Sequence, residues 1–274
     1  MTVTPENPIG LDGFEFVEFT SPDAAKMTAL IEQLGFTAYA KHPTKAITRY
    51  KQGKINLLVN LETAGQAADF RTAHGPSANG MAFRVADAKA AYELALSRGA
   101  KAADAGASAF PEAYVLEGIG GSLLYLVDRF GDAGTIYDGW EQIPGAAEAE
   151  AVNGVGLDLL DHLTHNVKRG QMRTWSSFYN QIFGFEEQKY FDIKGQATGL
   201  FSQAMIAPDK AIRIPLNESQ DDKSQIEEFI REYKGEGIQH LALTTPDIYD
   251  TVERLRARGV KLQDTIETYY ELVD

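Results

Sequence analysis

Two pairs of similar segments recur along this chain, and they constrain its fold more than any other feature. The segment LDGFEFVEF, starting at Leu11, aligns with LDHLTHNVK, starting at Leu160. Without a gap, NGMAFRVADAKAAYELALSRGAK (79–101) aligns with QHLALTTPDIYDTVERLRARGVK (239–261). Each member of the second pair first alternates apolar and polar residues, as a half-buried strand does, and then continues with helical periodicity. The chain is therefore predicted to consist of two structural repeats.

The ends of the repeated helices follow one pattern. An aspartate precedes each helical run, Asp87 in one copy and Asp247 in the other. Each run ends in Arg-Gly, which places Gly99 and Gly259 just beyond the helix, where glycine is favoured. Each unit thus predicts a strand, a helix and two or three further strands, the βαβββ module. We expect an α+β fold in which tandem βαβββ modules form two half-barrels or open barrels, each curved around a cavity.

The repeats also predict the domain organisation. Residues 1–150 form an N-terminal domain and residues 151–274 a C-terminal domain, joined by the stretch GAAEAEAVNG (145–154). The second domain is expected to be incomplete at its C-terminal end. Only QDTIETYYELVD follows Leu262, whereas the first half has strand material such as AYVLEGIGGSLLYLVDRFG at the corresponding place.

Composition excludes several classes of function. The chain has no cysteine, which removes disulfides and thiolate metal sites and is typical of a cytoplasmic protein. The net charge of −13 argues against nucleic-acid and anionic-membrane partners. No apolar run approaches the roughly 18 residues that a membrane span needs. We expect a cytoplasmic protein.

The two halves differ at one informative pair of positions. Gly13 aligns with His162, and Gly80 aligns with His240, so only the second half carries histidines on the first strands of both its modules. Two histidines and one carboxylate form the facial triad of non-haem Fe(II) oxygenases. A histidine on a strand is more often a hydrogen-bonded structural residue, and His165, three residues after His162, should project to the opposite face. The repeat by itself leaves a shared metal site and two structural histidines as alternatives.

Several longer motifs carry a family resemblance. The segment LDHLTHN is followed by a WxxFYxxxFGF helix, residues 175–185, and then by YFDIKGQATGLFSQAM, IRIPLNES, KSQIEEFI and GEGIQHLAL. The N-terminal half contributes NPIGLDGFEFVEF, YKQGKINLLVN and LEGIGGSLLYLVDRFG. Together these motifs resemble the bacterial 4-hydroxyphenylpyruvate dioxygenase family, which belongs to the vicinal oxygen chelate superfamily. The resemblance covers essentially the whole chain.

The resemblance implies a site and a reaction. Its iron, Fe(II), is held by His162 and His240 and by a glutamate that we expect beyond Asp274. The substrates are O₂ and the 2-oxo acid 4-hydroxyphenylpyruvate, and the products are homogentisate and CO₂, as in tyrosine catabolism. The implied substrate-binding residues are Ser202, Pro215, Asn217, Gln225 and Gln239. Of these, Asn217, Gln225 and Gln239 are also implied in catalysis. The resemblance further suggests a homodimer or homotetramer, assembled through the first half.

Two alternatives remain at this stage. A hydroxymandelate synthase-like enzyme would use the same substrate and metal but hydroxylate the side chain, whereas Pro215 and Asn217 in the segment IPLN favour ring hydroxylation. A non-catalytic binding protein of the same fold would lack a complete metal site. The acidic residues close to the end of the chain, Glu267, Glu271 and Asp274, match a loop of the family and are not assigned as the third ligand.

Overall fold

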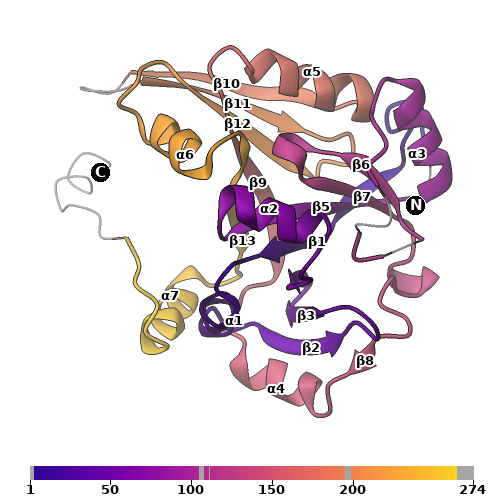
Figure 1. Cartoon of the computed structure of the whole chain (residues 1–274), viewed down its shortest axis with the longest axis vertical. Coiled ribbons are helices and arrows are strands. Elements are labelled where there is room, and N and C mark those ends of the chain that lie inside the picture. The colour runs from indigo at the N-terminus through magenta and orange to yellow at the C-terminus, as the bar shows by residue number, and fades with distance from the viewer. Residues whose placement is uncertain (1–2, 105–107, 111, 195–198, 264–274) are drawn as a thin grey trace.

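The computed structural model describes residues 3–104, 108–110, 112–194 and 199–263, with the side chains of 190–194 excepted. Its strands form two open sheets, with helices packed against them (Figure 1). The predicted α+β fold of repeated strand–helix–strand units is confirmed, and neither sheet closes into a barrel.

The first sheet has eight strands in the order β6-β7-β5-β1-β4-β3-β2-β8. The parallel contacts β1–β4 and β5–β7 join hairpins and meanders into one surface. The strands are β1 (Leu11–Thr20), β2 (Thr37–Lys41), β3 (Ile47–Gln52), β4 (Ile55–Asn60), β5 (Ser77–Val85), β6 (Tyr114–Glu117), β7 (Leu123–Val127) and β8 (Glu141–Gln142).

The second sheet has five strands in the order β10-β11-β12-β9-β13. It repeats the pattern of the first, because β9 pairs with β12 in parallel and with β13 antiparallel, as β1 pairs with β4 and β5. Within the described residues, β13 forms the edge of this sheet. The strands are β9 (Leu159–Val167), β10 (Glu186–Lys194), β11 (Gly199–Ile206), β12 (Arg213–Ser219) and β13 (Gly237–Thr244).

The helices begin and end largely where local sequence signals predict. The Asp87 carboxylate accepts a hydrogen bond from the Ala90 N–H at the start of α3, and Asp247 caps α7 in the same way. Gly99 and Gly259 follow these two helices with φ of 98° and 79°, conformations that favour glycine. The helices are α1 (Ala24–Gln33), α2 (Gln66–His74), α3 (Ala88–Ser97), α4 (Ala146–Asn153), α5 (Met172–Phe183), α6 (Gln225–Tyr233) and α7 (Ile248–Ala257), and short 3₁₀ turns span Ile119–Gly121 and Gly131–Ala133. No helix in the described part of the chain is long and apolar enough to cross a membrane.

One apolar cluster extends across both sheets, and a second lies within the first half. Phe83 of β5 packs edge-on against Phe183 at the end of α5, with ring centroids 5.5 Å apart, and also contacts Phe185 at 6.1 Å. All three rings are fully buried. Polar contacts add to this junction, since the Arg98 guanidinium donates to the Ile182 carbonyl oxygen at 2.8 Å. The division into domains at residues 150 and 151 stays a prediction, because the two sheets share their core.

The stretch that was expected to join the halves is itself folded. Residues 146–153 form α4, which contacts β2 of the first sheet. Glu150 of α4 also forms an ion pair of 2.7 Å with Lys51 of the neighbouring strand β3. The connection between the two repeats is therefore held against the first sheet.

Candidate metal centre

Most of the residues predicted for the site lie on one face of the five-stranded sheet. They are His162, Ser202, Pro215, Asn217 and His240. Side chains alternate along a strand, and paired residues on neighbouring strands point to the same face. His240 pairs with Thr164, which is two residues from His162 on β9. Asn217 pairs with Asn166 of β9 and with Ser202 of β11, so the register joins all four strands into one surface.

The opposite face of the sheet packs against α5 and contains the core. Leu163, Ile214 and Leu216 on this face are fully buried. His165 is also fully buried there, and its Nε2 lies 2.7 Å from the Tyr179 hydroxyl of α5. The expectation that His165 faces away from His162 is therefore confirmed. Burial lowers the pKa of His165 to about 3, so this imidazole is neutral and structural.

His162 and His240 bring their imidazoles together. Their ring centroids are 5.6 Å apart and the ring planes meet at 71°. His162 Nδ1 lies 2.8 Å from an Asp161 carboxylate oxygen. A carboxylate that accepts from Nδ1 assigns the proton to that nitrogen and leaves Nε2 with its lone pair.

His240 is held in a corresponding way. Its Nδ1 contacts the Gln239 amide oxygen, and its Nε2 lies 2.9 Å from the Thr164 hydroxyl. An amide oxygen accepts a hydrogen bond, so Nδ1 again carries the proton and the Thr164 hydroxyl donates to Nε2. Removal from water, and secondly the neighbouring His162, lower the pKa of His240. A neutral imidazole is the form that binds a metal ion.

The donor set fits a divalent first-row metal. Two imidazoles held by hydrogen bonds at Nδ1 can supply two of the three ligands of a facial triad. Within the part of the chain that is described, no group of three His, Cys, Asp or Glu residues could hold a metal ion. The Asp161 carboxylate is already engaged by His162 and Arg213. The expected third ligand, and the three acidic residues that were left unassigned, lie outside the described residues.

The first half carries other residues at the positions of the two histidines. Ala82 and Gly80 of β5 correspond to Ala242 and His240 of β13, and Ala82 pairs with Phe16 whereas Ala242 pairs with His162. The strand register therefore places Phe16 at the position of His162, and the predicted correspondence of Gly13 with His162 is wrong. Gly80, which aligns with His240, lies against a filled core. A Cβ atom there would be 3.1 Å from a ring carbon of Tyr125 and 3.3 Å from a carboxylate oxygen of Glu18.

A buried carboxylate replaces the metal centre in that half. Glu18 is fully buried and has three hydrogen-bond donors around it. Asn60 Nδ2 donates at 2.7 Å, Asn79 Nδ2 at 2.9 Å and the Tyr125 hydroxyl at 2.6 Å. Burial, and secondly the neighbouring carboxylate, raise the pKa of Tyr125 well above its usual value, which keeps its hydroxyl proton available for this bond.

The two predicted glutamines have different surroundings. Neighbours on a regular strand face opposite ways, which would turn Gln239 away from His240. The pairing of β13 with β9 shifts register between Ile238 and His240, and this bulge lets the Gln239 amide reach the imidazole. Gln225 lies exposed in the first turn of α6, and its role in the site stays a prediction.

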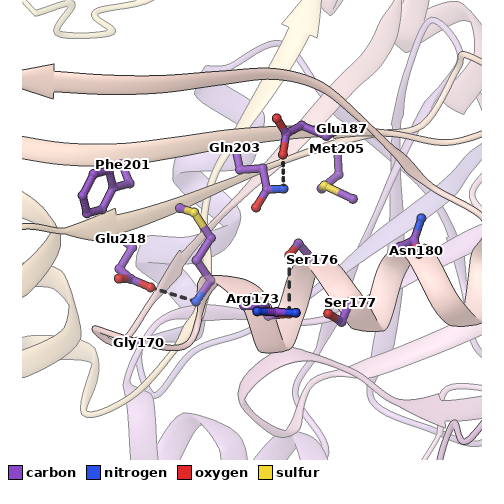
Figure 2. Close-up of a pocket in the computed structure, with 11 residues that line it drawn as sticks. Gly170, Arg173, Ser176, Ser177, Asn180, Glu187, Phe201, Gln203, Met205 and Glu218 are labelled. Carbon is purple, nitrogen blue, oxygen red and sulfur yellow. Dashed lines mark hydrogen bonds between the residues drawn. The ribbon is translucent and has the colours of Figure 1, made fainter.

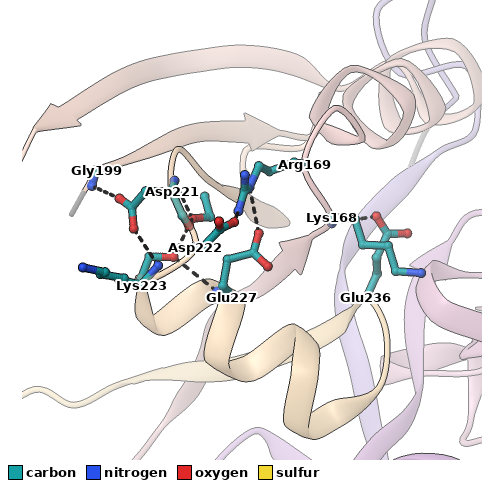
Figure 3. Close-up of polar contacts among 10 residues, drawn as sticks. Lys168, Arg169, Gly199, Asp221, Asp222, Lys223, Glu227 and Glu236 are labelled. Atoms are coloured by element: carbon teal, nitrogen blue, oxygen red, sulfur yellow. Dashed lines mark hydrogen bonds and ion pairs between the residues drawn. The ribbon is translucent and has the colours of Figure 1, made fainter.

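A polar network anchors the start of α6, where Gln225 lies. Figure 3 shows Arg169 between Asp222 and Glu227, and the Arg169–Glu227 pair measures 3.1 Å. Asp221 accepts hydrogen bonds from the N–H groups of Gly199 and Lys223, and these bonds lower the pKa of its carboxyl group. The loop before α6 is therefore tied both to β11 and to the turn after β9.

A cavity of about 590 Å³ lies on the α5 side of the sheet (Figure 2). In Figure 2 the polar side chains of α5 face strand residues such as Gln203 and Glu187. None of its lining residues was predicted for the site. They are Gly170, Met172, Arg173, Ser176, Ser177, Asn180, Glu187, Phe201, Gln203, Met205 and Glu218.

Three residues near the histidines were not predicted from the sequence. Thr164 could have been found, because it lies two residues from His162 on the same strand and so shares its face. Asp161 and Arg213 could not, since their contacts depend on the pairing of β9 with β12.

Comparisons with known proteins identify the family of this chain. Residues 5–140 match the family model "Hydroxyphenylpyruvate dioxygenase, HPPD, N-terminal". Residues 159–272 match the model "Glyoxalase/Bleomycin resistance protein/Dioxygenase superfamily". The chain is 56% identical to 4-hydroxyphenylpyruvate dioxygenase of Pseudomonas aeruginosa, over 99% of this chain and 77% of that protein. It is 53% identical to Hemolysin VllY of Vibrio vulnificus, over 98% of this chain and 76% of that protein.

A solved structure extends the comparison to the fold. A mutant of 4-hydroxymandelate synthase from Streptomyces coelicolor superposes with a TM-score of 0.82, over 96% of this chain and 80% of that one. At 24% identity this likeness shows the fold alone. The match to the Pseudomonas aeruginosa protein, together with the two family models, decides the assignment. The chain belongs to the 4-hydroxyphenylpyruvate dioxygenase family, within the vicinal oxygen chelate superfamily.

Proposed function

We propose that this protein is an Fe(II)-dependent 4-hydroxyphenylpyruvate dioxygenase, which converts 4-hydroxyphenylpyruvate and O₂ into homogentisate and CO₂ in tyrosine catabolism. The observation that supports it most directly is the convergence of His162 and His240, with both Nδ1 atoms engaged. A metal ion at His240 Nε2 would replace the hydrogen bond from the Thr164 hydroxyl. The 56% identity to a relative of that name supports the substrate.

When bound, Fe(II) supplies the coordination of the 2-oxo acid and the activation of O₂. The protein then has to hold the metal, orient the aromatic ring and exclude water. His162 and His240 hold the metal through Nε2. We propose that the third ligand is the glutamate that the family resemblance implies.

The strand residues on the same face as the histidines orient the aromatic ring of the substrate. A phenol needs an apolar slot with a small number of polar groups at defined places. Pro215 supplies an apolar wall, and Ser202 and Asn217, paired across β11 and β12, place a hydroxyl and an amide side by side. The amides of Gln225 and Gln239 complete the proposed set and, with Asn217, direct the ring during the reaction.

The direct test is product formation by the purified protein with Fe(II), ascorbate and 4-hydroxyphenylpyruvate. We expect homogentisate by chromatography, and loss of turnover in His162→Ala. His42→Ala is the matched control, because His42 lies in the first half and bonds to its own turn through Nδ1. Equal turnover by His162→Ala and the parent would contradict the metal site. A hydroxymandelate product would identify the synthase-like alternative, and substrate binding without turnover the non-catalytic one.

We also propose a compartment, an oligomeric state and a role for each half of the chain. We place the enzyme in the cytoplasm as a homodimer or homotetramer, with residues 1–150 as a structural and oligomerisation domain and residues 151–274 as the catalytic domain. Light scattering after size-exclusion chromatography tests the assembly. A monomer at micromolar concentration would contradict that part.

A further inference from the structure

A chain of contacts reaches His162 from outside the candidate metal centre. The Arg213 guanidinium donates to one oxygen of Asp161 at 2.9 Å, and the other oxygen of Asp161 lies 2.8 Å from His162 Nδ1. Arg213 is the partner of His162 in the parallel pairing of β12 with β9. The strand register therefore holds all three side chains together.

The carboxylate makes this contact different from the one at His240. Asp161 can only accept a hydrogen bond when it is ionised, so it requires the proton on Nδ1 of His162. At His240 the acceptor for Nδ1–H is instead the neutral amide oxygen of Gln239. A charged acceptor raises the electron density of the imidazole more than an amide does, and so strengthens Nε2 as a metal donor.

Arg213 has a separate effect on Asp161. Its guanidinium occupies the carboxylate oxygen that His162 does not use, which fixes the orientation of the carboxylate. Asp161 and His162 are neighbours on one strand, where side chains normally diverge. The Arg213 contact therefore helps to hold Asp161 turned toward His162.

We propose that Asp161 and Arg213 are positioning residues, which fix His162 as the Nδ1–H tautomer and direct its Nε2 lone pair toward the metal. This inference rests on the proposed function, since it requires a divalent cation at His162 and His240. Acceptors that hold the second nitrogen of a ligating histidine typically contribute about 10- to 100-fold to metal affinity.

The test measures Co(II) affinity by competition with a chromophoric chelator, using protein from the complete reading frame. We expect Asp161→Ala to weaken Co(II) binding by about 10- to 100-fold, with Asp161→Asn and Arg213→Gln between it and the parent. The control is Asp158→Ala, which removes a carboxylate just before β9 whose surface pair with Lys54 measures 3.5 Å. We expect it to bind Co(II) as the parent does, because exposed ion pairs contribute little.

A second measurement does not depend on metal. Nitrogen-15 NMR of the histidine rings in the metal-free protein reports the tautomer of each of the five histidines, and His162→Ala assigns the signal. We expect His162 as Nδ1–H in the parent and a mixture with the Nε2–H form in Asp161→Ala. If circular dichroism shows that Asp161→Ala does not fold, the tautomer of His162 in the parent and in Asp161→Asn tests the proposal instead.

The outcomes separate the two proposals. If His162→Ala binds Co(II) as tightly as the parent, the metal site of the proposed function fails. If His162→Ala weakens binding and Asp161→Ala does not, the positioning role alone is overturned. An Nε2–H tautomer in the parent would also overturn it.

Discussion

His165 should make the stability of this protein sensitive to mild acid. Its imidazole is fully buried between β9 and α5, and its Nδ1 has no hydrogen-bond partner among the described residues. Burial lowers the pKa of His165 from 6.5 to about 3. In the unfolded chain the ring takes up a proton below pH 6.5, whereas in the folded protein it does not. Stability is therefore full above pH 6.5 and falls progressively as the pH drops toward 3.

The size of the effect follows from the two pKa values. Between pH 7.5 and pH 5.5 the proton bound by unfolded His165 should lower the free energy of unfolding by about 1.4 kcal/mol. The measurement stops at pH 5.5 because the pI is about 4.9, and near its pI a protein tends to self-associate. His165→Gln removes the titration but keeps a hydrogen-bonding group for the Tyr179 hydroxyl.

The assay is urea unfolding at both pH values, followed by tryptophan fluorescence. Other titrating groups are shared by parent and variant, so the difference between their pH dependences isolates His165. We expect the parent to lose about 1.4 kcal/mol more than His165→Gln between the two pH values. Tyr179→Phe is the matched control, because it leaves the buried imidazole in place and should retain the parent dependence. Identical pH dependences of parent and His165→Gln would refute the reasoning.

Three further predictions concern the core, the junction and the metal. Glu18→Ala should lower the free energy of unfolding by about 3 kcal/mol in chemical denaturation, because it removes the shared acceptor of three buried donors, of which only Asn79 Nδ2 has a second acceptor, the Gln66 amide oxygen; a loss below about 1 kcal/mol would contradict this. Gly120→Ala should cost at least about 2 kcal/mol more than Gly121→Ala, since both residues have positive φ but only the first would place a Cβ 2.0 Å from the Glu236 carbonyl oxygen. Chelation of the metal should lower the Tm of the parent and leave that of His162→Ala unchanged; equal shifts would argue against metal binding at this histidine.

Local signals in the sequence predicted the elements well. The aspartate caps at Asp87 and Asp247 and the glycines at 99 and 259 act within a few residues of where they occur, so the repeat located both helices. The three-residue spacing of His162 and His165 predicted that they would face opposite ways, because alternation along a strand is also local.

Contacts that depend on the pairing of distant strands could not be predicted. The bulge that turns Gln239 toward His240 arises from the register of β13 against β9. The Asp161–Arg213 contact needs the parallel pairing of β9 with β12. Glu18 alternates with apolar residues in the sequence as a solvent-facing residue would, and only the fold shows that it is enclosed by amide and hydroxyl donors.

The core that both sheets share has a consequence for the history of this chain. The repeats mark the unit that was copied, whereas the burial of Phe83 against Phe183 and Phe185 marks the unit that folds. A half produced by itself would expose these rings to water, so duplication created a module that no longer stands alone. Each half shields the apolar residues of the other from water. A substitution at Phe83 should therefore be tolerated only together with a compensating substitution at Phe183 or Phe185.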